Sequence, residues 1–455
     1  MMSARGTRYM PLDFLRGLSI FGMVLSAIQP HGVMPGWMYH VQNPPPTHDL
    51  NMSVPGIGWV DMVFPIFIFC MGASIPFAKP SVKGVFARFG MLWLFSYLYV
   101  FINSSNPWVT LAGFAALFPL YMVFKNPPRF AGKEVPVAAI RVVGALLVAA
   151  VIWVNHQFFA EVLSVQRRGI IIFLLAFLYL FGSLIWLYTQ QKKRLRWGIW
   201  LAILAFTIVT QQLGWPTTTY ANPAIRWWFN VEYFYFLLLL VPSTFVGEMI
   251  KEKAGDSGEL EQPGTLEVPA RSKWLLAALC FALVAWLLYA FYMQMYWWNV
   301  GLSGIILLGI LAYAKKVAPQ WLPVLRVAAF MVYAGVLLEP YGGGIKKVPC
   351  TIQYCFAAGG MAMLLLYVAE RICCRFRNGF ITRVFEGAGK NPLMSYIAFN
   401  CLVLPLIELS GLIYLYRMAY PQGVHWAGFL RSVFVVLLTM WIVGLFTRKK
   451  IFWKA

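Results

Sequence analysis

The fold of this chain is decided by residues 29–80, QPHGVMPGWMYHVQNPPPTHDLNMSVPGIGWVDMVFPIFIFCMGASIPFAKP. The second half of the stretch is an apolar run of about 20 residues, long enough to cross the hydrocarbon core of a membrane as a helix. The first half is a polar, proline-rich loop, and no Lys or Arg occurs before Lys79. Asp61 opens the apolar run. Three of the five histidines of the chain lie in the loop: His31, His40 and His48. The stretch predicts a membrane helix whose N-terminal end is covered by a loop that contains three histidines.

The composition places the rest of the chain in a membrane as well. The chain has 455 residues, of which 60% are hydrophobic and 12% are charged, about half the charged fraction of a typical soluble domain. Its mean hydropathy is +0.69. Apolar runs recur along its whole length, so we expect an all-α, polytopic transmembrane bundle of about 11–14 spans, folded as one domain over residues 1–455.

The predicted spans alternate with loops of opposite character. They lie at about 11–28, 59–78, 89–103, 109–124, 135–154, 170–189, 197–213, 231–250, 274–293, 299–314, 321–338, 351–369, 393–414 and 430–447. Basic loops alternate with loops poor in Lys and Arg, and basic loops face the cytoplasm. We therefore expect cytoplasmic N and C termini, a cytoplasmic loop at about 251–273 and an outer loop at about 29–58.

The charge and the cysteines exclude other classes of protein. Lys and Arg outnumber Asp and Glu by 37 to 16, giving a net charge of +21, but most basic residues lie in loops between spans, so this is no signal for nucleic acid. The seven cysteines lie mostly in or beside apolar segments and form no disulfide framework. Because no Cys or His pairs have the spacing of metal ligands, the sequence predicts no metal site.

The first span carries an ionisable pair. Asp13 and Arg16 are three residues apart and share one helix face. Such groups are costly in a membrane and face a partner or a cavity. They form either a structural pair or a site at which Arg16 binds an anionic ligand. Asn391, at the start of the penultimate span, is likewise either a helix cap or a ligand contact.

The outer loop offers two candidates for a general base. His40 and His48 lie above the helix mouth that Asp61 marks, and neutral imidazole is the usual base near neutral pH. Asp61 either caps the loop or orients a histidine. A single loop histidine is more often solvated than catalytic, but two beside a carboxylate favour a catalytic site. The choice between His40 and His48 stays open.

One other outer loop breaks the charge pattern. EPYGGGIKKVP, residues 339–349, carries Lys346 and Lys347 on the side where basic residues are otherwise scarce. Its three glycines and flanking prolines predict a tight, irregular backbone. The two lysines are either solvated or part of an anion-binding turn that folds back toward the histidines.

Together these stretches resemble a known family. LDFLRG (12–17), Tyr39-His40-Val41 and the pattern Gly-x-x-x-x-Asp-x-Val-Phe-Pro-x-Phe-x-Phe-x-x-Gly (Gly56 to Gly72) are similar to the transmembrane acyltransferases typified by heparan-α-glucosaminide N-acetyltransferase. EPYGGGIKK and GKNPLMSY fit bacterial members of that family. The resemblance is specific across residues 12–80 and thin in the middle of the chain.

The resemblance implies a bacterial inner-membrane enzyme with acetyl-CoA as donor substrate, an amino sugar or related glycan as acceptor, and a histidine at the transfer centre. In the family an asparagine stands eleven residues before that histidine. Here Gln29 stands eleven residues before His40, which favours His40 and implies a hydrogen bond from Gln29 to the thioester oxygen. The implied contacts to the coenzyme, above all to its phosphates, are Arg16, Lys346, Lys347 and Asn391.

The sequence thus predicts a membrane acyltransferase that moves an acetyl group from cytoplasmic acetyl-CoA to a glycan outside. The rival hypothesis is a transporter or flippase for a sugar or lipid-linked glycan, in which the same polar residues bind cargo. Transporters are commonly built from inverted repeats with paired broken helices, and no convincing internal repeat is visible in this sequence. The acceptor, direct or two-step transfer, and assembly as a homodimer stay open.

Overall fold

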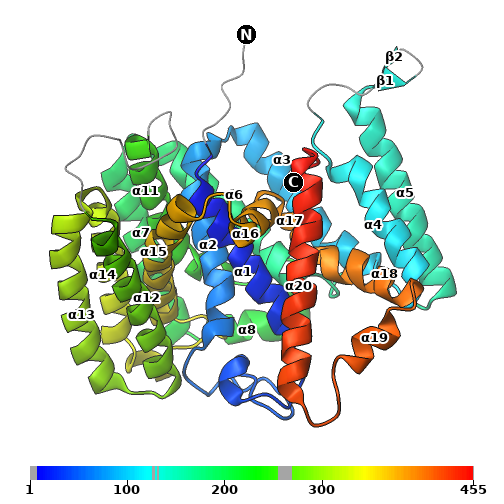
Figure 1. Cartoon of the computed structure of the whole chain (residues 1–455). Helices are drawn as coiled ribbons and strands as arrows, with labels where there is room; N and C mark the ends of the chain where they lie inside the picture. Colours follow the sequence, from blue (N-terminus) through cyan, green and yellow to red (C-terminus); the bar gives the residue numbers. More distant parts are fainter. Residues whose placement is uncertain (1–7, 125–128, 131–132, 255–268, 454–455) are drawn as a thin grey trace.

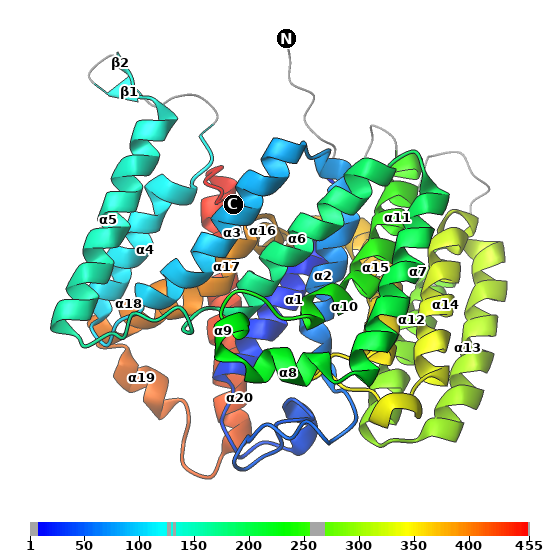
Figure 2. The ribbon, with the colours of Figure 1, turned by 180° about the vertical axis from the view of Figure 1, so that it is seen from behind.

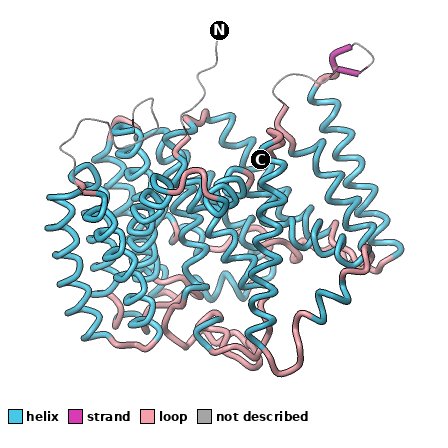
Figure 3. Tube along the Cα trace, viewed as in Figure 1, coloured by secondary structure: helices cyan, strands magenta, loops and turns pink. Residues whose placement is uncertain are grey.

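The computed structural model describes residues 8–124, 129–130, 133–254 and 269–453. Regular structure is almost entirely helical (Figure 3), as the apolar runs predict. The described strands, β1 (Arg129–Phe130) and β2 (Lys133–Glu134), form one small antiparallel hairpin. Of the predicted cytoplasmic loop at 251–273, residues 255–268 lie outside the described part of the chain.

Most of the long helices run side by side through one bundle (Figures 1 and 2). They are α1 (Met10–Ile28), α2 (Trp59–Ala78), α3 (Val82–Phe101), α4 (Pro107–Tyr121), α5 (Val137–Phe158), α6 (Ile170–Thr189), α7 (Lys193–Gln212), α11 (Leu237–Ala254), α12 (Ala270–Tyr292), α13 (Tyr296–Val317), α14 (Leu322–Leu337), α15 (Ile352–Arg375) and α20 (His425–Arg448). Among the described residues, twelve helical segments are long and apolar enough to cross a membrane. The chain is therefore a multi-pass, all-α membrane protein, as expected.

Short elements join or interrupt the long helices. They are η1 (Gly36–Met38), α8 (Trp215–Ala221), α9 (Pro223–Arg226), α10 (Glu232–Tyr235), η2 (Pro319–Trp321), η3 (Tyr341–Gly343), α16 (Phe380–Lys390), α17 (Pro392–Ala398), the π-helical turn η4 (Phe399–Val403), α18 (Leu404–Leu409) and α19 (Ile413–Met418). Two predicted spans are not among the twelve segments. The helix α4 has 15 residues, about 22 Å in length, and α7 begins with the basic run Lys193-Arg194-Leu195-Arg196.

The two ends of the bundle differ in character. The helix α1 begins and α20 ends at the same end of the bundle, which we call the inner end, and residues 29–58 lie at the opposite, outer end (Figure 1). Basic helix ends such as 193–196 and 315–316 gather at the inner end, as the alternating loops predict. That the inner end faces the cytoplasm is a prediction from its positive charge.

The stretch after α15 differs from the sequence prediction of a basic loop over residues 370–390. It holds the helix α16, which is amphipathic and packs along α1. Glycines allow the two backbones to approach closely. A Cβ atom on Gly17 would lie 1.9 Å from the carbonyl oxygen of Phe385, and one on Gly389 would lie 1.7 Å from that of Asp13. LDFLRG and GKNP, which are far apart in sequence, therefore meet.

The predicted span at 393–414 is also different. The segment is divided into α17, the turn η4 and α18, and it runs obliquely to α20 in both views (Figures 1 and 2). Pro405 lies in the first turn of α18, where its missing N–H cannot complete a helical hydrogen bond. The chain then continues through α19 instead of emerging from one straight span.

Candidate functional site

The loop of residues 29–58, which we call the histidine loop, is held by its own polar side chains. Gln29 is buried and its Nε2 donates to the Met38 carbonyl oxygen at 2.7 Å. The Tyr39 hydroxyl donates to the Pro30 oxygen at 2.5 Å and accepts from the Met34 N–H at 2.9 Å. These bonds fix the short helix η1 and so the backbone that leads into His40.

A second outer loop closes over the first. Residues 339–351, the lysine loop, are joined to the histidine loop by a Gly56 N–H that donates to the Ile345 oxygen at 2.7 Å. The Gln42 amide pairs with the Val348 main chain, donating to its oxygen and accepting from its N–H at 2.8 Å. The lysine loop therefore does fold back toward the histidines.

The result is a cluster of His40, Asp61 and Lys347. His40 Nδ1 lies 2.6 Å from Asp61 Oδ1. Lys347 Nζ lies 3.2 Å and 3.4 Å from Nδ1 and Nε2 of His40, and 3.8 Å from Asp61 Oδ1. The His40 side chain is 35% exposed, whereas that of Asp61 is 3% exposed. The cluster is thus anchored in the protein and open on its histidine.

The Asp61 carboxylate serves both of the roles that the sequence left open. It lies in the first turn of α2, and its Oδ2 accepts from the Gly58 N–H at 3.0 Å, which caps the helix. Its Oδ1 faces His40. The Tyr354 hydroxyl on α15 donates to the main-chain oxygen of Asp61 at 2.6 Å. A carboxylate fixed in this way selects the His40 tautomer with hydrogen on Nδ1. The lone pair then lies on Nε2, which Lys347 Nζ approaches to 3.4 Å.

Lys347 is the second charged residue in contact with His40, and the sequence alone only suggests this contact. Burial lowers the pKa of its amine, and the nearby Asp61 carboxylate partly opposes this. Its neighbour Lys346 points to a different role, because the Lys346 N–H donates to Thr351 Oγ1 at 3.0 Å and its oxygen accepts from the same hydroxyl at 3.2 Å. Of the two predicted lysines, the structure brings Lys347 to the histidine.

His48 has its nitrogens engaged within the histidine loop. Its Nε2 accepts from the Gly32 N–H at 3.0 Å and its Nδ1 lies 3.0 Å from the Asn43 oxygen. Its ring centroid lies 4.0 Å from that of His31. Burial, followed by the neighbouring His31, lowers the pKa of His48. In this arrangement His48 stabilises the loop, whereas His40 lies between a carboxylate and a lysine and its side chain is 35% exposed.

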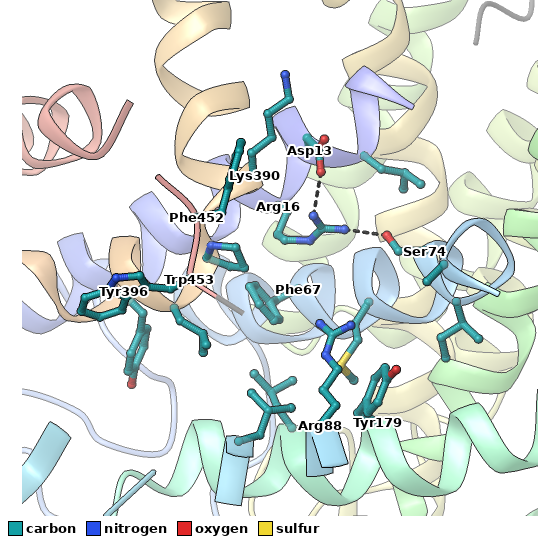
Figure 4. Close-up of a pocket in the computed structure, with 18 of the residues that line it drawn as sticks. Asp13, Arg16, Phe67, Ser74, Arg88, Tyr179, Lys390, Tyr396, Phe452 and Trp453 are labelled. Atoms are coloured by element: carbon teal, nitrogen blue, oxygen red, sulfur yellow. Dashed lines mark hydrogen bonds and ion pairs between the residues drawn. The ribbon is translucent and has the colours of Figure 1, made fainter. Parts of the chain in front are cut away.

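At the inner end, Asp13 and Arg16 form the predicted ion pair, with Arg16 Nη1 2.7 Å from Asp13 Oδ1 (Figure 4). Arg16 also donates to Ser74 Oγ at 2.5 Å, to the Gly389 oxygen at 3.1 Å and to the Cys70 oxygen at 3.3 Å. The guanidinium therefore ties α1 to α2 and α16. Asp13 and Arg16 thus form an ion pair with structural contacts, and Arg16 also borders a cavity.

That cavity has a volume of about 890 Å³. Apolar side chains such as Met23, Phe67 and Leu175 form much of its wall, and cations border it. The Arg88 guanidinium lies 4.3 Å above the Tyr179 ring, and its buried Nε has no hydrogen-bond partner among the described residues (Figure 4). A smaller hollow of about 270 Å³ shares some of the same wall and is lined by Arg8, Met10, Asp13, Arg377, Asn378, Arg383, Glu386 and Lys390.

Asn391 is fully buried beside this cavity and does not line it. Its Nδ2 donates to the Ile451 oxygen at 3.0 Å, and its Oδ1 accepts from the Trp453 N–H at 3.0 Å. Phe452 and Trp453 in turn form part of the cavity wall (Figure 4). Asn391 thus positions the C-terminal segment and acts on the cavity only through it.

The predicted site residues therefore form two groups at opposite ends of the bundle. Gln29 caps the end of α1, thirteen positions after Arg16, which is about 20 Å along the helix axis. The cavity extends from the inner end as far as Met23 and Phe67. Phe67 lies six residues from Asp61 on α2, about 9 Å. Arg16 and Lys347 therefore cannot bind the same phosphate group.

Sequence reasoning missed the cations of the cavity. In the sequence Arg8 and Arg88 only flank the predicted spans at 11–28 and 89–103, and Tyr179 is one aromatic residue within the apolar run at 170–189. Their convergence depends on how α1, α3 and α6 pack, which no local pattern reports. A signal was nevertheless present, since Arg88 lies well inside the helix that begins at Val82 and a cation there needs a partner or a cavity.

Comparison with protein families matches residues 8–250 to a domain of unknown function, DUF5009. The match covers more than half of the chain, and the chain belongs to this family. It includes the histidine loop, Asp61 and most of the cavity wall, but not the lysine loop. A comparison with curated proteins found no match.

Proposed function

We propose that this member of the DUF5009 family is a membrane-embedded acyltransferase that moves an acetyl group from acetyl-CoA at the inner end to an amino sugar or related glycan at the outer end. One observation carries the proposal. His40 is held by Asp61 at 2.6 Å with Lys347 at 3.2 Å, and its ring is partly exposed at the outer end. A carboxylate, an oriented imidazole and an adjacent cation are the components of a general-base site for acyl transfer.

In direct transfer, the acceptor amine attacks the thioester carbonyl carbon. A carbon–nitrogen bond forms, His40 Nε2 takes the proton from nitrogen, and Asp61 stabilises the resulting imidazolium. The carbon–sulfur bond then breaks, and the departing CoA thiolate receives the proton. In two-step transfer, Nε2 attacks the thioester first, the carbon–sulfur bond breaks, and CoA leaves as its thiolate. The acceptor amine then attacks the acetyl group on Nε2, the bond from the acetyl carbon to Nε2 breaks, and the proton lost by the amine passes to Nε2. Both routes need the Nδ1–H to Asp61 hydrogen bond, because it places the lone pair on Nε2.

Lys347 is assigned to the oxygen of the reacting carbonyl. Negative charge develops on this oxygen as the carbonyl becomes tetrahedral, and donors already aimed at it lower the barrier. The ammonium of Lys347 is close enough to His40 to reach an atom bound at Nε2. Gln29 is then a supporting residue, since its amide holds the turn before His40.

The inner cavity is assigned to the coenzyme. Arg8 and Arg88 have no carboxylate partner among the described residues, which leaves their guanidinium groups available for phosphates. The apolar wall that continues toward Met23 and Phe67 suits an extended acyl arm. Reaching His40 requires this arm to pass between α1 and α2 over the last 9 Å or so.

The rival transporter class makes a different use of the same residues. A carrier would move a sugar without consuming a thioester, and the π-helical turn between α17 and α18 is the kind of interruption that carriers place at binding sites. Purified protein in detergent, supplied with acetyl-CoA and glucosamine, separates the two. An acyltransferase releases free CoA in proportion to N-acetylated sugar, whereas a carrier leaves the acetyl-CoA intact.

A further inference from the structure

We propose that Cys350 and Cys355 form a disulfide bond that fastens the lysine loop to the first turn of α15. Their Sγ atoms lie 3.4 Å apart, and both side chains are fully buried. A disulfide has a sulfur–sulfur distance of about 2.05 Å, so the two atoms need to approach by about 1.4 Å. This modification is independent of the proposed acyl transfer.

The pair lies where a cross-link would act on the cluster. Cys350 is three residues after Lys347, and Cys355 directly follows Tyr354, which donates to the Asp61 main chain. The surroundings already hold both cysteines. The Cys350 oxygen accepts from Gln211 Nε2 at 2.8 Å, and Cys355 Sγ lies 3.4 Å from the Tyr235 oxygen. A covalent bond here would fix Lys347 and Tyr354 relative to each other.

The compartment also favours oxidation of this pair. The lysine loop lies at the end of the bundle opposite the basic helix ends, which the charge pattern assigns to the outside. Disulfides form and persist outside the cytoplasm and are rare within it. Cys373 and Cys374 lie near the inner end of α15, so they should remain thiols.

The chemistry is a thiol–disulfide exchange. The two thiols lose two protons and two electrons, one sulfur–sulfur bond forms, and a disulfide donor outside the membrane is reduced to a dithiol. Burial raises the pKa of the Cys350 thiol, so the reactive thiolate is suppressed once the protein has folded. The bond therefore forms before the lysine loop packs and is protected from reductant afterwards.

Peptide mass spectrometry tests the proposal directly on the full chain. Cells are lysed straight into denaturant with N-ethylmaleimide, so that every thiol is trapped. Trypsin cuts after Lys347 and Arg371, and the resulting peptide, residues 348–371, contains Cys350 and Cys355 and no other cysteine. The expected peptide is unalkylated and two hydrogen atoms lighter than the dithiol, and it accepts two maleimides after reduction. A peptide that already carries two maleimides before reduction would overturn the proposal.

Variants provide a second measurement. In Cys350→Ser the remaining Cys355 should be alkylated in full, and the reverse should hold in Cys355→Ser. Reductant added to the purified wild type should leave the disulfide intact in the folded protein and open it after denaturation. The matched control, Cys374→Ser, should keep the unalkylated peptide 348–371. Equal alkylation of Cys355 in wild type and Cys350→Ser would contradict the cross-link.

Discussion

The outer cluster of His40, Asp61 and Lys347 and the inner pair of Asp13 and Arg16 are both ion pairs at the ends of membrane helices, but they use their hydrogen bonds differently. Arg16 donates to four acceptors and ties three helices together. His40 has one nitrogen bound to a fixed carboxylate and the other beside a lysine, and its side chain is 35% exposed.

The difference distinguishes charged side chains with a structural role in this protein from side chains that are placed to react with a ligand. A charge whose terminal nitrogens both donate within the protein, like Arg16, has little left for a ligand. A group oriented on one side and open on the other, like His40, has a free position for chemistry. The same criterion separates Arg88, whose Nε has no hydrogen-bond partner in the described part of the chain, from Arg16 on the wall of the same cavity.

The largest expected effect is at His40. His40→Ala should lower acetyl transfer by about 10²–10⁴-fold, the usual contribution of a general base, and leave acetyl-CoA binding largely intact. His48→Ala should be the milder change, because His48 acts through loop structure. His156→Ala is the matched control and should retain wild-type turnover in the same CoA-release assay. A dead His48→Ala beside an active His40→Ala would transfer the catalytic assignment to His48.

The next largest difference in activity is expected between substitutions of Lys347 and of its neighbour Lys346. Lys347→Met should lower kcat by about 10²–10³-fold, as loss of one donor to a developing oxyanion does. Lys346→Met should change kcat little, since the Lys346 main chain supplies the contacts to Thr351. Initial rates at saturating acetyl-CoA measure both variants. Equal losses in the two would mean that the loop as a whole, and not the Lys347 amine, is required.

Substitution of the two cavity arginines should affect different properties, CoA binding for Arg88 and thermal stability for Arg16. Arg88→Gln should weaken CoA binding by roughly 10- to 150-fold, since a charge-assisted hydrogen bond contributes about 1.5–3 kcal/mol. The control Lys83→Gln lies on the same helix, outside the cavity wall, and should bind normally. Arg16→Gln should mainly lower thermal stability, because Asp13 would be left as a buried, unpaired charge. Normal CoA binding in Arg88→Gln, measured by calorimetry, would place the phosphates elsewhere.

The smallest effect is a pH dependence at the outer end. Burial raises the pKa of Glu339 to about 7. A carboxyl with a raised folded-state pKa stabilises the fold fully below its unfolded pKa of about 4.5, and this contribution is lost as the pH rises through about 7. Glu339→Gln should therefore flatten the fall in melting temperature between pH 5 and pH 8, whereas the exposed Asp49→Asn should leave it unchanged. A wild-type slope in Glu339→Gln would show that another group titrates.

The sequence is sufficient to predict those features of the fold that depend on residues close together in the chain. Runs of apolar residues determine the long helices, and the charge pattern put both termini at one end of the bundle. The helix α16 was missed because it is short and amphipathic, and its packing depends on Gly17 and Gly389 in different helices. The pairing of His40 with Asp61 could be anticipated because one loop covers the mouth of one helix. Lys347 could not be distinguished from Lys346, since the contact depends on Gln42 bonding to Val348, 306 residues away.

The central claim is that His40 completes a transfer across the membrane, and proteoliposomes test it most directly. Acetyl-CoA labelled in its acetyl group is sealed inside vesicles that contain the purified protein, and glucosamine is supplied outside. Wild-type protein should produce labelled N-acetylglucosamine in the outer medium while free CoA accumulates inside, and His40→Ala should produce neither. If the label stays on coenzyme inside the vesicles of both proteins, or if His40→Ala matches the wild type, the account is contradicted.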